Sequence, residues 1–408
     1  DGFASLRSDA DMQPLADAAR CRSEADWLVG INGTRAMTAF NSKSGGFFLT
    51  TVGRVQTPTL SIVVEREELI RKFISKDYWE VKAEFIAAAG VYEGRWFDPK
   101  FKKDAAIPDA RENRLWSEAA AQSIVAACRD KKASVREEAK PATQLAPQLF
   151  DLTSLQREAN ARFGFSAKNT LGLAQALYEK HKVITYPRTD SRYLPEDYLG
   201  TVFGTMKTFA SHDDRKIDAL PADLGKHAAT ALDNKWIRPT KRVFDTSKVS
   251  DHFAITPTGV IPKNLKPEEQ KLFDMVTRRF IAVFYPAAEF EVTTRITRIE
   301  DDAFKTNGKV MKVPGWLEVY GKLASENDDS IVPAAAGEKA QNEGIEVTEN
   351  ITKAPAHFNE GSLLQAMPFL KNDERIPVWQ AMYDKAIALL KEEDLTRVGD
   401  RQTLVKDS

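Results

Sequence analysis

The order of apolar and polar positions divides the chain into helical and β-rich regions. Alanine and charged residues interleave over 9–39, a composition that favours a helix. Pro58 suits the first turn of a second helix, which has Thr57 as its N-cap and continues to about Lys72. Alternating apolar and polar residues then predict half-buried strands. These strands lie at 78–85, 91–96 and 133–138, with an Ala-rich helix at 117–128 between the last two.

The stretch from about 146 to 285 is predicted to be mainly helical. One helix opens at Asp151, with Thr153 and Gln156 as a capping box and Gly164 as its stop. Another helix begins after Ser166 and ends near His181. The remaining predictions are a helix at 265–286, strands at 289–296, 309–313 and 316–320, a loop at 334–344, a helix after Phe358 capped by Asn359 or Ser362, and an amphipathic helix at 379–392.

Composition sets broad limits on the class of protein. The chain has 408 residues, of which 42% are hydrophobic, so more than one domain is expected. Lys and Arg number 58 against 59 Asp and Glu, and the net charge of −1 argues neither for nor against nucleic acid. Basic side chains can be confined to one groove of a protein whose total charge is near zero.

Cysteine usage and hydropathy point to a protein of the cytoplasm. Only Cys21 and Cys128 are present, and they form neither a metal-binding spacing nor a disulfide framework. The sequence contains no signal peptide and no apolar run long enough to span a membrane. We therefore expect a cytoplasmic protein with no membrane partner.

The segment 182–193 carries the strongest candidate chemistry. Residues 183–185 predict a short buried strand, and Pro187 keeps Tyr186 extended and ends that strand. Tyr186 then lies near Arg188 and Arg192, which makes it a candidate nucleophile facing an anion. Tyrosine has a reference pKa near 10, and neighbouring cations help by favouring the phenolate. The alternative is a half-buried aromatic residue whose hydroxyl is held by one partner.

Other polar residues are candidates for binding an anion or for assisting catalysis. Arg188 could neutralise a phosphate through paired donors, and Asp190 is close enough in sequence to orient one of the arginines. Arg54 precedes a helix start, a position that suits anion binding, although a solvated arginine is the alternative. Lys168, near another helix start, has the same two interpretations. His252 stands in a Pro-bounded loop, where an isolated histidine is more often structural.

The amino-acid sequences of two segments resemble motifs of a known family. Ile184–Ser191 reads Ile-Thr-Tyr-Pro-Arg-Thr-Asp-Ser, which resembles the active-site signature of type IA DNA topoisomerases, in the topoisomerase III branch. The resemblance implies that Tyr186 attacks a DNA phosphodiester, stays attached to the 5′ phosphate and releases a 3′ hydroxyl. Asp251–Thr258 resembles an element that lies near the active tyrosine in that family, which implies that His252 assists catalysis.

The same resemblance assigns a groove for single-stranded DNA. Asp26–Asn32 with Thr34–Ala36, and Gly53–Pro58, look like segments that line this groove in the family. The catalytic residues expected from the resemblance and the local pattern are Tyr186, Arg188 and His252. The DNA-binding residues expected on the same grounds are Arg35, Arg54, Gln56, Lys168, Thr189, Asp190, Ser191 and Arg192.

The family fold implies an α+β, multi-domain protein in which helical domains and a β-rich arch form a toroid. Residues 76–145 and 286–350 would be two passes of the arch, or hinge domain. Residues 146–285 would be the domain with the active tyrosine. Residues 1–75 and 351–408 would be two parts of a helical domain, the second incomplete.

Two elements of the family pattern are missing from the sequence. Asp9 and Asp11 have the Asp-x-Asp spacing of a toprim domain, but no strand precedes them and no glutamate is placed as a partner, so they are assigned no metal. The family's Gly-x-Gly-Thr element does not follow within 393–408. We therefore expect a fragment that is inactive alone, with Mg²⁺ bound by a toprim-containing segment or chain.

Three classes of function are compatible with these observations. The leading one is a topoisomerase that cleaves and rejoins one DNA strand without ATP, in agreement with the lack of a nucleotide-phosphate loop motif. The second is a non-catalytic clamp fragment that binds single-stranded DNA through aromatic and arginine side chains. A relaxase is weaker because it needs a clustered histidine metal site and the five histidines are scattered, and a tyrosine recombinase is weaker because its set of arginine and histidine partners is not found.

Overall fold

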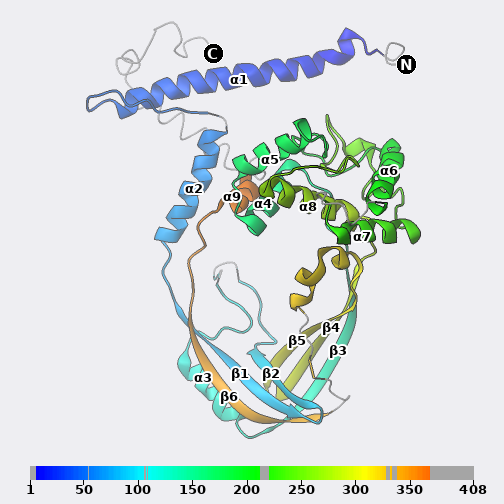
Figure 1. Cartoon of the computed structure of the whole chain (residues 1–408). Coiled ribbons are helices and arrows are strands. Elements are labelled where there is room, and N and C mark those ends of the chain that lie inside the picture. The colour runs from blue at the N-terminus through cyan, green and yellow to red at the C-terminus, as the bar shows by residue number, and fades with distance from the viewer. Residues whose placement is uncertain are drawn as a thin grey trace. The chain divides into compact units, whose positions relative to one another are not determined.

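The computed structural model separates the chain into two compact units, and each is described by itself. It describes residues 6–53, 55–104, 107, 109–211, 220–327, 331–332 and 338–367. The first unit comprises residues 1–72 and 355–408, and the second comprises residues 73–354. Figure 1 traces both units from the N-terminus in blue to the last described helix in orange.

The described part of the first unit contains three helices, in which few residues are buried. They are α1 (Asp9–Asn41), α2 (Gln56–Arg71) and α9 (Glu360–Ala366). The chain returns along the C-terminal third of α1, where Val52 N donates to Thr34 Oγ1 at 3.0 Å and Thr50 N donates to Thr38 Oγ1 at 3.0 Å. Arg66 of α2 stacks on the Phe358 ring, 4.1 Å from its centroid, just before α9.

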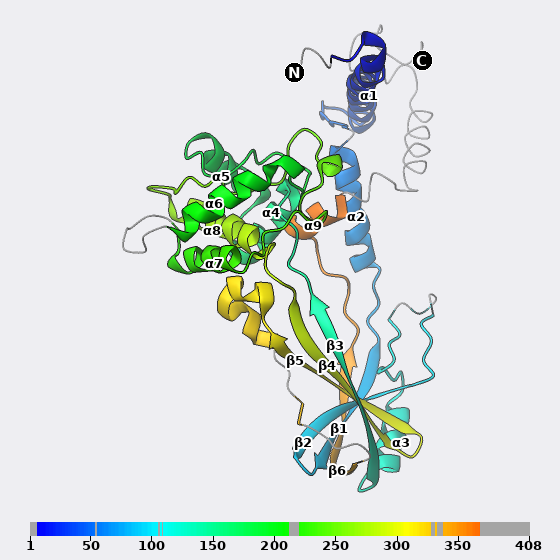
Figure 2. The same cartoon turned by 90° about the vertical axis from the view of Figure 1, so that its right-hand side faces the viewer.

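The second unit contains a closed six-stranded barrel, whose strands cross one another in the view of Figure 2. Neighbouring strands are antiparallel and follow the order β1-β2-β5-β4-β3-β6. The helix α3 (Glu118–Cys128) packs on it through Ala121 and Val125, which join a core with Val81 and Phe85. The strands are β1 (Asp77–Ala87), β2 (Gly90–Phe97), β3 (Lys132–Gln144), β4 (Ala288–Ile299), β5 (Asp302–Val313) and β6 (Lys339–Ile351).

A helical body lies between the strands β3 and β4 in the sequence. Its main core contains Leu155, Leu177, Phe273 and Phe280, all at most 1% exposed, and it extends to Phe290 at the start of β4. Ten residues of α8 are buried, so this helix is the centre of the body. The elements are α4 (Leu152–Phe163), α5 (Ala167–Glu179), η2 (Glu196–Tyr198), α6 (Leu199–Ala210), α7 (Ala222–Asp233), η3 (Thr246–Lys248), α8 (Pro267–Ala282) and, after β5, η4 (Gly315–Asn327).

Most of the predicted helices and strands are confirmed within a few residues, but several details are wrong. The second helix starts at Gln56 with Val55 as N-cap, so Thr57 is inside the helix. The capping box of α4 uses Asp151 and Ser154 in place of Thr153 and Gln156. Both pairs fit the sequence pattern, and the structure selects the earlier one because the helix begins at Leu152.

Two further predictions are wrong near the end of the second unit. The stretch 316–320 belongs to the helical η4 rather than to a strand, because Trp316, Val319 and Tyr320 are buried at helical spacing. The predicted loop at 334–344 overlaps β6, which starts at Lys339. The helix predicted at 379–392 lies outside the described residues, and the five-part domain division stays a prediction.

Candidate active site

Three extended segments of the helical body meet around Tyr186. Thr185 N donates to Thr256 O at 2.8 Å, and Ile255 N donates to Phe150 O at 2.8 Å. The Thr185 hydroxyl donates to Ala254 O at 2.9 Å and accepts from Thr256 N at 2.9 Å. These contacts connect the segments at 146–151, 183–194 and 243–258.

The predicted strand at 183–185 forms only an isolated bridge. Ile184 pairs with Pro257, and no ladder continues from that pair. Proline has no N–H to donate, so Pro257 on one side and Pro187 on the other prevent an extended ladder. The buried Thr185 hydroxyl supplies the hydrogen bonds that a longer ladder would otherwise provide.

Side chains after Tyr186 point alternately inward and outward. Pro187, Thr189 and Ser191 are buried, whereas Arg188 and Asp190 are exposed. The Thr189 hydroxyl donates to His252 O at 2.7 Å, and the Ser191 hydroxyl donates to Lys248 O at 2.9 Å. The side chains of Thr189 and Ser191 therefore fix the segment against its neighbour, and their contact with DNA stays a prediction.

Tyr186 lies between two rings. Its centroid is 4.3 Å from the His252 ring and 5.4 Å from the Tyr178 ring of α5. Among the described residues, no hydrogen bond holds the partly exposed Tyr186 hydroxyl, and His252 is exposed beside it. The hydroxyl is thus free to meet a substrate, with an imidazole next to it.

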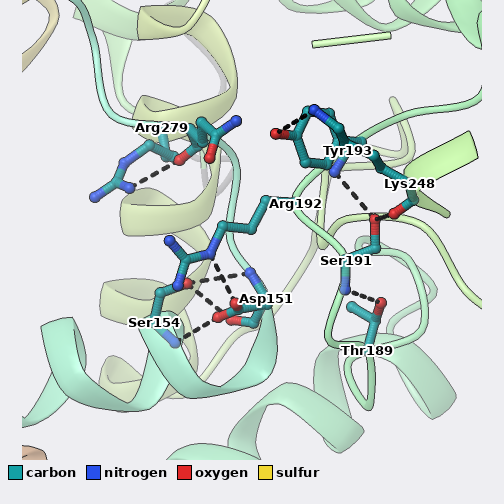
Figure 3. A network of polar contacts seen from close by, with 9 residues as sticks. Asp151, Ser154, Thr189, Ser191, Arg192, Tyr193, Lys248 and Arg279 are labelled. Atoms are coloured by element: carbon teal, nitrogen blue, oxygen red, sulfur yellow. Dashed lines mark hydrogen bonds and ion pairs between the residues drawn. The ribbon is translucent and has the colours of Figure 1, made fainter. Parts of the chain in front are cut away.

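The two arginines of the segment differ in their partners. Arg192 Nε donates to Asp151 Oδ2 at 2.7 Å, while Asp151 Oδ1 accepts from Ser154 N at the start of α4 (Figure 3). Arg188 is exposed and has no hydrogen bond or ion pair to any residue that the structure describes. Its full set of donors is available to an anion.

Asp190 does not orient an arginine, which corrects the expectation from the sequence. Its Oδ1 accepts from the Ser250 hydroxyl at 3.0 Å, so it joins the segment to the 243–258 loop. Asp151 orients Arg192 instead, from 41 positions earlier in the chain. The signal that could have found it is an aspartate immediately before a predicted helix.

A second pair of residues, Tyr193 and Lys248, was missed by sequence reasoning. The Lys248 ammonium lies 4.7 Å from the centroid of the Tyr193 ring and 3.4 Å from its hydroxyl oxygen. Figure 3 shows this pair near Ser191, with Tyr193 on the same segment as Arg192 and Lys248 on the facing η3. Hydrogen bonds from Gln148 and from Lys248 lower the pKa of the Tyr193 hydroxyl.

The other predicted DNA-binding residues are distributed over both units. Lys168 is exposed in the first turn of α5, in the same unit as Tyr186. Gln56 is exposed as the first residue of α2, and Arg35 of α1 has a buried Nη1 without a hydrogen-bond partner. Arg54 lies outside the described residues.

The described residues do not assemble a site for a divalent cation. No group of three or more His, Cys, Asp or Glu side chains comes together among them. Asp11 is used by the N-terminus of α1, where its Oδ2 accepts from the Ser8 hydroxyl at 2.7 Å. Mg²⁺ does not fit this set of residues. No described helix is both long and apolar enough to cross a bilayer.

Comparisons with known proteins place this arrangement in context. A family model described as DNA topoisomerase matches residues 10–371. The chain is 36% identical over 390 residues to DNA topoisomerase 3 of Bacillus subtilis, covering 92% of this chain and 49% of that protein. It is 37% identical over 379 residues to DNA topoisomerase 3 of Bacillus cereus, covering 90% of this chain and 48% of that protein.

The fold is also shared with a solved structure. Full-length topoisomerase I from Thermotoga maritima superposes with a TM-score of 0.59 at 21% identity, covering 89% of this chain and 54% of that one. At this identity the match concerns the fold alone. The chain spans about half the length of the curated relatives that it matches.

Proposed function

Because the chain belongs to the type IA DNA topoisomerase family and is similar to topoisomerase 3, we propose that Tyr186 is its DNA-cleaving nucleophile. The substrate is one strand of DNA in a single-stranded region. The observation that carries the proposal is the Tyr186 hydroxyl beside His252, with Arg188 two residues further on, neither of them hydrogen-bonded to a side chain in the described part of the chain.

The proposed reaction is a transesterification. The Tyr186 oxygen forms a bond to phosphorus while the bond from phosphorus to the 3′ oxygen breaks. The phenol proton leaves, and the 3′ oxygen takes up a proton as it departs. The product is a 5′-phosphotyrosine with a free 3′ hydroxyl, and the reverse reaction rejoins the strand. One phosphodiester replaces another, so no ATP is consumed.

The neighbouring side chains have separate roles in this proposal. Arg188 presents paired donors to the non-bridging oxygens, where negative charge increases in the transition state. His252, with its ring 4.3 Å from the Tyr186 ring, is placed to hold or move a proton near the scissile phosphate. Arg192, oriented by Asp151, would contact a neighbouring phosphate of the same strand.

We assign the Mg²⁺ expected for the whole enzyme to a toprim-containing segment or chain, since the described residues do not fit the ion. Arg35, Arg54, Gln56 and Lys168 are proposed as further contacts to the single strand. We expect the chain by itself to bind DNA without cleaving it.

The test combines binding and covalent capture. The chain would be mixed with a labelled single-stranded oligonucleotide and Mg²⁺, with and without a toprim domain from a relative, and run on native and denaturing gels. We expect a native shift in both cases and a denaturing adduct only with the toprim domain. Tyr186→Phe should remove the adduct and leave the shift unchanged. An adduct that persists in Tyr186→Phe would disprove the assignment of the nucleophile.

The second candidate is a clamp that binds single-stranded DNA without cleaving it. It is favoured by the lack of a metal-ligand cluster among the described residues. A native shift with no adduct in any combination would support the clamp over the topoisomerase.

A further inference from the structure

Tyr193 and Lys248 form an exposed pair that the proposed reaction does not use. Lys248 belongs to η3, and its side chain is 53% exposed. Its ammonium lies 3.4 Å from the Tyr193 hydroxyl oxygen and 3.6 Å from Asp245 Oδ2. Both distances are long for a hydrogen bond to a charged donor, so the three ammonium protons are only weakly engaged.

Asp245 only partly compensates the charge of Lys248. Its Oδ1 accepts from the Ser247 hydroxyl at 2.6 Å, and that bond lowers the pKa of the Asp245 carboxyl. The carboxylate is therefore ionised but directed mainly at Ser247. Lys248 retains a positive charge with free donors at the surface.

Hydrogen bonds connect Lys248 to the segment that carries both Tyr186 and Tyr193. The Ser191 hydroxyl donates to Lys248 O at 2.9 Å, and Tyr193 N donates to Ser191 Oγ at 3.2 Å. Ser191 N donates in turn to Thr189 Oγ1, whose hydroxyl donates to His252 O. Seven extended residues span at most about 25 Å, which sets the greatest distance between the Cα atoms of Tyr186 and Tyr193.

We propose that Lys248 and the Tyr193 hydroxyl together bind one phosphate of the strand that Tyr186 cleaves, away from the scissile bond. The inference rests on the proposed function, because it takes its ligand to be single-stranded DNA. Arg188, Arg192 and Lys248 then present cationic groups to successive parts of the same strand. The hydroxyl would donate one hydrogen bond to the phosphate and the ammonium would supply the charge.

The expected signature is a change in the salt dependence of binding. Each phosphate contact by a cation contributes about −0.7 to the slope of log K against log[salt] for single strands. Removing one such contact should lower the magnitude of the slope by about 0.7 and weaken binding about fivefold at 0.1 M salt. A neutral donor contributes to affinity without contributing to this slope.

The experiment measures binding of a fluorescein-labelled oligothymidylate to the full chain, by anisotropy, between about 50 and 200 mM salt. Lys248→Met is the test variant, and Lys226→Met on α7 is the matched control for loss of one exposed lysine. We expect the reduced slope in Lys248→Met alone, its recovery in Lys248→Arg, and weaker binding with an unchanged slope in Tyr193→Phe.

The inference is overturned if Lys248→Met keeps the slope and affinity of the unmodified chain, or if Lys226→Met changes them equally. Thermal unfolding of each variant would show that the fold is kept, since Lys248 and Lys226 are both exposed. If the Lys248 inference is wrong, Tyr186 should still form its covalent adduct with DNA. Failure of the proposed function would instead appear as a missing Tyr186 adduct in the presence of a toprim domain.

Discussion

At the scale of single residues, the position of Tyr186 depends on buried hydroxyl groups. Thr185, Thr189 and Ser191 each direct a hydroxyl to a backbone carbonyl of the facing loop. A buried hydroxyl in this position replaces the ladder that the prolines prevent. The reactive side chains can then remain at the surface, because the buried hydroxyl groups fix the backbone that carries them.

Replacing Thr185 with valine tests this role. The change keeps the shape but leaves Ala254 O and Thr256 N without a partner, which should lower the free energy of unfolding by about 1–3 kcal/mol. Urea unfolding would measure it. Thr185→Ser keeps the hydroxyl and should cost clearly less than Thr185→Val. Equal losses in the two variants would mean that the hydrogen bonds contribute little.

At the residue scale, the sequence could suggest only those candidates whose side-chain type or motif indicates a function, and their roles stay predictions. Tyr186 and Arg188 could be proposed because their types and their neighbours in the chain fit an anion site, whereas His252 was proposed only from the family resemblance. Asp151 and Lys248 could not, because their importance comes from contacts with Arg192 and Tyr193, which lie far from them in sequence. Such partners are decided by folding rather than by local pattern.

At the scale of elements, packing at helix ends and turns determines which glycines can be replaced by a larger residue. Gly315 begins η4 with φ 53°, and a Cβ there would fall on the carbonyl oxygen of Ala287, with Pro286 O at 2.6 Å. Gly321, inside η4, has φ 62° but nothing within 4 Å of a Cβ. The two glycines therefore separate steric overlap from backbone strain.

Gly315→Ala should destabilise the protein by more than about 2 kcal/mol, because overlap adds to the strain of a left-handed conformation. Gly321→Ala should cost less than Gly315→Ala, about 1–3 kcal/mol, because it adds only the strain of its own backbone conformation (φ 62°, ψ −141°). Thermal or urea unfolding of both variants gives the comparison. A similar loss in both would show that the chain at Ala287 moves aside freely.

The contact between α7 and the end of α8 should make stability depend on pH. Burial lowers the pKa of His227 from its ordinary 6.5, opposed by Asp223 and Glu318 and aided by Arg278. Its Nδ1 lies 3.0 Å from the Tyr285 hydroxyl. Below pH 6.5 the unfolded chain therefore binds more protons at this position than the folded chain does.

The free energy of unfolding should accordingly fall as pH drops from about 7 to 5. His227→Gln removes the titrating group, so its stability should vary less over this range. Urea unfolding at each pH would measure both proteins. If the free energy of unfolding of the variant depends on pH in the same way, titrating groups other than His227 cause the dependence.

The elements themselves were predictable where periodicity is strong. Helices such as α8 and strands such as β1 bury residues at the spacing that the sequence shows. The start of β6 was predicted to be a loop because 334–344 is rich in alanine, glycine and charge, and the buried positions Ala340 and Asn342 do not show an apolar alternation. Strand order could not be read at all, since it depends on pairings between distant segments.

At the scale of the whole molecule, burial is distributed unevenly. The 33-residue α1 buries five residues, whereas the 16-residue α8 buries ten. Helical stability in proteins comes mostly from packing of one face, so long exposed helices are held weakly. Trp27 and Leu28 remain 58% and 44% exposed on α1.

Hydrogen exchange should reflect this difference. Amides of Asp9–Val29 in α1 should exchange early, while those of α8 should approach the protection of global unfolding. Exchange followed by mass spectrometry would resolve the two helices. Equal protection would mean that another segment or a partner covers α1.

The closed barrel also limits the order in which the protein can form during synthesis. Its closing pair joins β1 (Asp77–Ala87) to β6 (Lys339–Ile351). Because β6 is synthesised last, β1 cannot form this pair until β6 has left the ribosome. At about 5–20 residues per second, that delay is on the order of tens of seconds. The helical body, whose sequence lies between, can complete its core in that time, while β1 and β2 keep an unpaired edge. Newly made chains are therefore most exposed to aggregation through the barrel strands, and a chaperone would act during that interval.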